Sequence, residues 1–157
     1  MRIKVAAAWI TVVGCVGGAP AGAQDLGPQF MKFGDGIYAY VGKNFKSNTG
    51  IILTQDGAVL IDSGHEPTDS RAVMEAVKKL TPMPVRFLID TEPHPDHTTG
   101  HFVFASTATI IAAAGAGESM RNRERQTPDR IEKLASTTPE MKAALEGYKF
   151  IPPQVEY

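Results

Sequence analysis

The sequence has almost no cysteine: Cys15 is the only one, and it lies within the first 23 residues. The rest of the chain therefore cannot contain an internal disulfide bond, and its stability must come from packing, with metal binding as a further source. Charge runs, internal repeats and low-complexity tracts are missing as well. Without a run of one charge sign, the sequence gives no indication of a strongly charged polymer as a partner.

A long apolar run is also missing. The uncharged apolar stretch from Val5 to Gly18 is shorter than the about 20 residues that a transmembrane helix needs. It follows the basic residues Arg2 and Lys4 and leads to small residues that end at Ala23, which is the three-part pattern of a signal peptide. We therefore predict cleavage after Ala23, no transmembrane segment, and a periplasmic or secreted protein.

Lipidation is an alternative for the same segment. Val12-Val13-Gly14-Cys15 resembles a bacterial lipobox, in which the cysteine is lipidated. Val13 stands where that motif prefers a smaller residue, and a good cleavage site follows it. The lipoprotein interpretation through Cys15 therefore ranks second.

Residues 24–157 are predicted to form one domain. Removal of residues 1–23 leaves 134 of the 157 residues, which is enough for a hydrophobic core. Because Arg2 and Lys4 lie in the leader, this part has 14 basic and 17 acidic residues and a net charge of −3. That balance argues against a nucleic-acid-binding protein.

Short apolar runs alternate with turn signals in this domain. The expected strands, rich in β-branched and aromatic residues, lie at 37–41, 50–54, 58–61, 85–89 and 108–112. Asp56-Gly57 predicts a hairpin turn, and residues 68–80 have the spacing of an amphipathic helix capped by Thr68 or Asp69. This order predicts an α/β (α+β) fold, in which the near-continuous apolar strands require cover on both faces of the sheet.

The N-terminal and C-terminal parts of the domain have other sequence patterns than its middle. Residues 24–32 are polar and read as a lead-in without regular structure. Helices are expected near 118–125 and after Thr127 and Thr138, each of which precedes a Pro and an acidic residue. Gln154–Tyr157 resembles the beginning of a further strand.

Side chains that can bind a metal ion are most concentrated in Thr91-Glu92-Pro93-His94-Pro95-Asp96-His97, directly after the apolar run 85–89. Two carboxylates and two imidazoles within six positions are the ligand types that zinc prefers. Two adjacent metal ions could activate a water molecule for attack on a carbonyl or phosphoryl group. The alternative is a polar surface loop that binds nothing. The density of ligand types favours a metal site.

Glu92-Pro93-His94-Pro95-Asp96-His97 resembles the H-x-H-x-D-H motif of the metallo-β-lactamase-fold hydrolases. Further segments are similar to the opening strand, the N-terminal hairpin, the aspartate-bearing loop and a later landmark of that family, namely Gly36–Tyr38, Asn48–Leu53, Val59–Gly64 and Pro152-Pro153. The resemblance implies an αββα sandwich, of which this chain would form the N-terminal half. It also implies one or two metal ions between the sheets, zinc ahead of manganese or iron.

The resemblance also assigns roles to individual residues. Glu92 and His94 would bind the first metal ion, and Asp96 and His97 the second, with Asp96 as the catalytic residue. Asp62 would support the ligand loop by hydrogen bonds, with an ordinary turn aspartate as the alternative. His65 would contact the substrate or would be a solvated loop histidine. His101, past the motif, is expected to pack or cap rather than to bind metal.

Two departures from the family pattern matter. Glu92 stands where the motif has His, and its anionic carboxylate would make the metal ion a weaker Lewis acid. Some lactamases of the family have Gln or Glu at this place. In addition, no His follows His101, although the family takes further ligands from its C-terminal half. The domain is therefore expected to be incomplete at its C-terminus, with an apolar sheet face left uncovered.

Two hypotheses about function follow. The first is a zinc-dependent hydrolase in which a metal-bound hydroxide attacks a small-molecule β-lactam, lactone, thioester or other ester. The second is a non-catalytic metal-binding fragment, with self-association or a complementing chain at the open sheet face. Under either, the isolated chain is expected to be weakly active or inactive.

Overall fold

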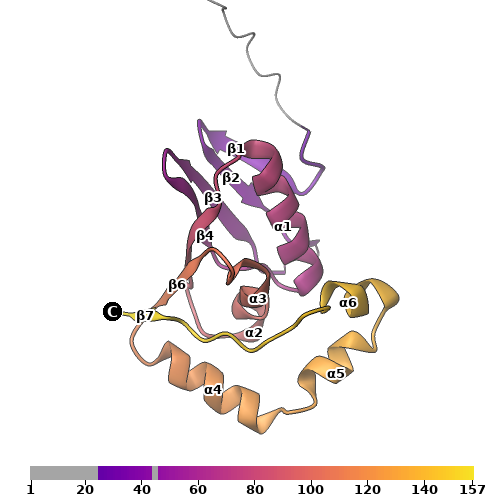
Figure 1. Ribbon diagram of the computed structural model, residues 1–157. Coiled ribbons are helices and arrows are strands. Elements are labelled where there is room, and N and C mark those ends of the chain that lie inside the picture. Colours follow the sequence, from indigo (N-terminus) through magenta and orange to yellow (C-terminus); the bar gives the residue numbers. More distant parts are fainter. Residues whose placement is uncertain (1–24, 44–45) are drawn as a thin grey trace, which may run out of the picture.

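The computed structural model describes residues 25–43 and 46–157. The predicted signal peptide and Cys15 lie outside these residues. Within them, seven strands form one sheet in the order β1-β2-β3-β4-β5-β6-β7, and helices lie along it (Figure 1). This arrangement confirms the mixed α/β class expected from the sequence.

The first four strands pair antiparallel and the later ones pair in parallel. Their bounds are β1 Phe30–Gly34, β2 Ile37–Tyr40, β3 Thr49–Thr54, β4 Gly57–Ile61, β5 Val85–Ile89, β6 Thr109–Ala112 and β7 Val155–Glu156. The hairpin turn between β3 and β4 and the short strand near the C-terminus lie where the sequence predicts them. β1 is an addition, since part of it was expected to be an irregular lead-in.

Helices connect the parallel strands and then extend past β6. Their bounds are α1 Pro67–Leu80, α2 Pro95–Thr98, α3 His101–Phe104, α4 Ala116–Gln126, α5 Arg130–Ala135 and α6 Pro139–Ala144. The predicted cap of α1 is wrong: Glu66 is the N-cap residue, and it shares a capping box with Asp69. Asp69 thus acts from the first turn, where its carboxylate accepts the amide of Glu66.

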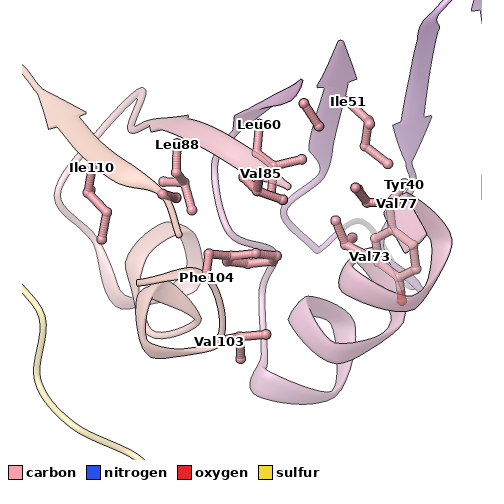
Figure 2. Packing of buried hydrophobic residues seen from close by; sticks show 12 residues of the cluster. Tyr40, Ile51, Leu60, Val73, Val77, Val85, Leu88, Val103, Phe104 and Ile110 are labelled. Carbon is pink, nitrogen blue, oxygen red and sulfur yellow. The ribbon is translucent and has the colours of Figure 1, made fainter. Parts of the chain in front are cut away.

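The core lies between one face of the sheet and helices α1 and α3 (Figure 2). Register places four fully buried side chains in one row across neighbouring strands, namely Ile51, Leu60, Leu88 and Ile110. The ring of Phe104 on α3 packs with this row, beside the apolar side chains of α1. The helices are therefore fastened to the sheet by the hydrophobic effect on a single face.

The opposite face of the sheet is exposed. Register aligns Ile37, Ile52 and Phe87 through Val59, and their exposed fractions are 47%, 38% and 40%. Strands with apolar side chains on both faces normally belong to sheets that are covered on both sides. The described residues cover only one side, as the sequence analysis expects.

None of the helices that the structure describes is both long and apolar enough to cross a lipid bilayer.

Candidate metal centre

The candidate site lies at the carboxyl ends of β4 and β5, where these parallel strands deliver their following loops to the same edge of the sheet. Asp62 follows β4 and Asp90 follows β5. The Asp62 side chain accepts hydrogen bonds from the Thr91 amide at 2.8 Å and from the Thr91 hydroxyl at 2.7 Å. Asp62 has a φ of 61°, a left-handed conformation that short polar side chains tolerate best among non-glycine residues. Asp62 therefore fastens the start of the ligand loop to the end of β4.

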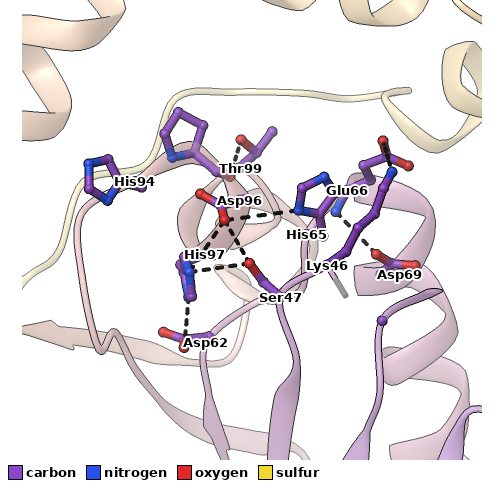
Figure 3. A network of polar contacts seen from close by, with 12 residues as sticks. Lys46, Ser47, Asp62, His65, Glu66, Asp69, His94, Asp96, His97 and Thr99 are labelled. Atoms are coloured by element: carbon purple, nitrogen blue, oxygen red, sulfur yellow. Dashed lines mark hydrogen bonds and ion pairs between the residues drawn. The ribbon is translucent and has the colours of Figure 1, made fainter. Parts of the chain in front are cut away.

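His97 is the centre of the polar cluster shown in Figure 3. Its Nδ1 atom lies 2.9 Å from an Asp62 carboxylate oxygen, which can only accept a hydrogen bond, so Nδ1 is the donor. Its Nε2 atom then faces the loop, 3.0 Å from Glu92 Oε1 and 3.4 Å from Asp96 Oδ2. Asp62 thus fixes the direction in which His97 presents its second nitrogen.

The charges around His97 favour a cation at Nε2. Partial burial acts to lower the pKa of His97, but the hydrogen bond to Asp62 and the surrounding carboxylates outweigh it and raise the pKa above 6.5. A proton on Nε2 satisfies the facing carboxylates in the ligand-free chain. A divalent cation in the same place would satisfy them equally, since it carries positive charge and takes the same donor atoms.

Glu92 joins the two predicted ligand pairs. One of its carboxylate oxygens contacts His94 Nδ1, and the other lies 3.0 Å from His97 Nε2. The chain is extended at His94 and turns into α2 at Pro95, which explains why the four ligand candidates converge from a short segment. The family resemblance pairs Glu92 with His94 only, whereas in the structure Glu92 lies between both histidines.

Asp96 faces a second group of polar side chains. Its Oδ2 atom accepts a hydrogen bond from Ser47 Oγ at 2.7 Å and lies 4.0 Å from His65 Nδ1. Burial acts to raise the pKa of Asp96, but hydrogen bonds from Ser47 and from a backbone amide, with the nearby imidazoles, hold the pKa below its ordinary value. Asp96 is therefore present as a carboxylate at neutral pH.

Ser47 is a site residue that the sequence analysis does not identify. Its hydroxyl also lies 3.2 Å from His97 Nε2. It enters the site because β3 pairs antiparallel with β4, so that the loop before β3 reaches the carboxyl end of β4. A turn serine beside a hairpin carries no local signal of this kind, and only the strand pairing brings it near the ligand loop.

His101 points away from the ligand loop, as expected. Its Nε2 atom lies 2.8 Å from Asp90 Oδ1, and its Nδ1 atom lies 2.8 Å from the Ile151 carbonyl oxygen. Both side chains are buried, and burial raises the pKa of Asp90 against the opposing effect of His101. This pair links the end of β5 to α3 and to the segment before β7.

The four predicted ligands contact one another two at a time and do not form a complete metal-binding site. Across residues 25–43 and 46–157, no group of three or more His, Cys, Asp or Glu side chains is already arranged to hold a metal ion. The donors nevertheless suit one, because an imidazole nitrogen and two carboxylates that face one another are ligand types that zinc prefers.

Comparison with known proteins identifies the family. The model of the metallo-beta-lactamase superfamily matches residues 42–152, well over half of the chain. The chain therefore belongs to the metallo-beta-lactamase superfamily. Members of this superfamily are hydrolases that bind metal ions. No curated protein matches the sequence.

Solved structures show the same fold. A metallo-beta-lactamase from Hirschia baltica has 17% sequence identity and a TM-score of 0.56, with 82% of this chain and 51% of that chain covered. A mono-zinc metallo-beta-lactamase from Pseudomonas aeruginosa has 16% identity and a TM-score of 0.52, with coverages of 82% and 49%. A B3 metallo-beta-lactamase described as having an active site glutamic acid has 31% identity and a TM-score of 0.51, with coverages of 61% and 37%. The chain spans about half, or less, of the length of these proteins.

Proposed function

We propose that this chain holds one or two divalent metal ions, zinc foremost, for the hydrolysis of a small-molecule substrate. The observation that carries the proposal is the Nε2 atom of His97, which lies between the carboxylates of Glu92 and Asp96 at the carboxyl ends of β4 and β5. Membership of the superfamily supports metal-dependent hydrolysis as the class of reaction.

Each side chain has a proposed task. When bound, the metal ion would supply Lewis-acid activation of water for attack on an electrophilic carbonyl group. Glu92 and His94 form one side of the site, and Asp96 and His97 form the other. Asp96, held ionised by its hydrogen bond from Ser47, is the proposed catalytic residue, because its carboxylate can orient the attacking water and hold the proton that leaves it.

Glu92 is proposed as a direct metal ligand in spite of the family's usual histidine. Carboxylate oxygen is a competent zinc ligand, and Glu92 contacts both histidines of the loop. The glutamic acid named for the B3 metallo-beta-lactamase, the neighbour at 31% identity, supports the same choice. We expect a site that tolerates harder ions such as manganese better than an all-imidazole site would.

The substrates proposed are β-lactams, lactones, thioesters and other esters. A panel of chromogenic substrates from these classes, assayed with the purified chain and added zinc, tests this. Turnover that disappears with a chelator and in Asp96→Ala supports the hydrolase. Turnover that survives both changes would exclude the site described here.

A second candidate is a non-catalytic metal-binding fragment that needs a complementing chain or self-association. The exposed apolar row of Ile37, Ile52 and Phe87 favours it, because such a face promotes association. In this case the chain binds zinc but turns over no substrate, and Ile52→Lys with Phe87→Lys shifts its elution toward the monomer. A monomeric parent chain with full turnover would rule it out.

We also propose the bounds of the signal peptide and of the domain, and the location of the protein. Residues 24–157 form the metal-binding domain after a signal peptide that ends at Ala23, which places the protein in the periplasm or outside the cell. Mass spectrometry of the exported protein tests this, since cleavage after Ala23 gives an N-terminal Gln24. A lipid-modified Cys15 would support the alternative.

A further inference from the structure

His65 carries a ring nitrogen without a partner beside the candidate metal centre. Its Nδ1 atom is buried and has no hydrogen-bond partner among the described residues, although the ring as a whole is 28% exposed. Buried polar atoms are nearly always satisfied, and an exception requires an explanation such as an ion that belongs there. Asp96 Oδ2 lies 4.0 Å from Nδ1, which points toward it in Figure 3.

The spacing around Asp96 Oδ2 suits a shared metal ion. Zinc–nitrogen and zinc–oxygen distances near 2.0–2.1 Å in a tetrahedron put neighbouring ligand atoms about 3.4 Å apart. The distance from Asp96 Oδ2 to His97 Nε2 is 3.4 Å, which meets this requirement. The distance from Asp96 Oδ2 to His65 Nδ1 is 4.0 Å, so that a small ring rotation would bring His65 into the same shell.

Hydrogen bonds of Ser63 connect the loop that carries His65 to the loop that carries His97. Ser63, two residues before His65, donates both its amide and its hydroxyl to the His97 carbonyl oxygen, at 2.9 Å and 2.6 Å. The Ser63 carbonyl oxygen in turn accepts the Ser70 hydroxyl on α1 at 2.6 Å. The loop that carries His65 is therefore fixed to the loop that carries Asp96 and His97, which is how a prearranged ligand set is built.

We propose that His65 Nδ1 is the third protein ligand of a metal ion bound by Asp96 and His97. This inference rests on the proposed metal site and extends it, because it gives one metal ion three ligands from this chain alone. The Ser47 hydroxyl, 3.2 Å from His97 Nε2, moves aside or becomes a neutral neighbour of the ion. The remaining coordination position is left for water or substrate.

A cavity of about 510 Å³ borders two of the three proposed ligands. His65 and Asp96 line it together with Pro95, Thr99, Arg130 and Leu134. A small molecule in this cavity would lie beside His65 and Asp96.

Metal titration of the full chain tests the proposal without reference to turnover. Zinc affinity is measured by chelator competition, and the coordination of bound cobalt is measured by visible absorption. Removal of a supporting group behind a ligand typically weakens binding 10–100-fold, so His65→Ala, which removes a ligand, should weaken it by at least about 100-fold. Lys133→Ala, a change in the same cavity at a side chain that pairs with Asp129, should leave affinity and spectrum unchanged.

A second variant keeps the test decisive if His65→Ala folds poorly. In a Cys15→Ser background, which removes the chain's own thiol, His65→Cys should produce a thiolate-to-cobalt charge-transfer band that the protein with His65 lacks, since thiolate is a strong ligand for such ions. Loss of affinity in His65→Ala with a new band in His65→Cys establishes the role. Parental affinity in His65→Ala, or no band in a cobalt-loaded His65→Cys, overturns it. If Asp96→Ala also binds zinc like the parent, the proposed metal site itself fails; if only the His65 variants do, that site stands without His65.

Discussion

The Asp62 carboxylate accepts a hydrogen bond from Nδ1 of His97 at 2.9 Å, and this contact determines which nitrogen of His97 faces the ligand loop. Asp62 belongs to the end of β4, whereas His97 belongs to α2 after β5. The sheet therefore positions the imidazole through a carboxylate that itself stays out of the site. Support of this kind fixes the tautomer and the ring orientation of a metal-binding histidine.

Replacement of Asp62 should weaken metal binding without removing a ligand. In Asp62→Asn, the amide nitrogen can donate to His97 Nδ1, which moves the ring proton to Nε2 and blocks the metal-facing nitrogen. Asn tolerates the left-handed backbone of this position, so the fold is retained. We expect zinc affinity to fall about 10–100-fold, measured by chelator competition. Asp56→Asn in the β3–β4 turn, where Asn-Gly is as favourable as Asp-Gly, is the matched control and should bind zinc normally.

Removal of one partner from the buried pair of Asp90 and His101 should strongly destabilise the fold. His101→Ala leaves the Asp90 carboxylate buried without its partner, and a broken buried pair typically costs about 3–5 kcal/mol. Urea unfolding followed by circular dichroism measures this change. The double variant Asp90→Val with His101→Leu removes both polar partners and should lose less stability than His101→Ala alone. A double variant as unstable as the single one would contradict the role of the unpaired charge.

Exchange of Glu92 should change metal preference. Glu92→His replaces a hard, anionic oxygen ligand by a neutral imidazole, which should increase the preference for zinc over manganese. Competition between the two ions, with bound metal measured after dialysis, gives the ratio. Glu92→Gln is the control for charge, because it removes the negative charge at nearly constant size. The same zinc-to-manganese ratio in all three proteins would mean that Glu92 does not bind the ion.

Lowering the pH should weaken the attachment of the C-terminal strand β7, because Glu156 becomes protonated. Hydrogen bonds from the amides of Gly115 and Gly117, at the start of α4, hold the pKa of Glu156 below 4.5. A pKa lowered by folding means that this contact stabilises the fold above pH 4.5 and is lost as the pH falls through the folded-state value.

Hydrogen exchange of the Gly117 amide, followed as the pH is lowered through 4.5, measures this loss. After correction for intrinsic exchange, protection should fall in the parent chain and should be weak at every pH in Glu156→Gln. Glu118→Gln, which changes a carboxylate in the first turn of α4 that makes no such contact, should behave like the parent. An identical pH dependence in parent and Glu156→Gln would exclude Glu156 as the titrating group.

Much of the fold follows from local patterns. The hairpin around Asp56-Gly57, the amphipathic helix α1 and the strand before the ligand loop have strong local signals, and the structure has all three. β1 was missed because its residues alternate weakly and its faces are largely exposed. It forms because pairing with β2 satisfies its backbone groups, which is a nonlocal effect.

Some residues of the candidate site also follow from local sequence patterns, and others do not. Glu92, His94, Asp96 and His97 are predicted as ligands because they are adjacent in the sequence, and Asp62 is predicted as their support because of the family resemblance. Ser47 and the orphaned nitrogen of His65 depend on how β3, β4 and β5 align their ends, which no local pattern specifies. The reach of Glu92 toward both histidines depends on the turn at Pro95, where an extended chain becomes helical.

Zinc binding by the parent chain and by His97→Ala tests the central claim most directly. His97 is the residue that Asp62 orients and that faces both ligand-loop carboxylates, so the measured stoichiometry and affinity depend on it. Chelator competition, run with Cys15→Ser in both proteins to exclude thiol binding, gives these values. The account predicts at least one zinc ion per parent chain and an affinity reduced by about 100-fold or more in His97→Ala. Equal zinc binding by the two proteins, or none by the parent, would contradict it.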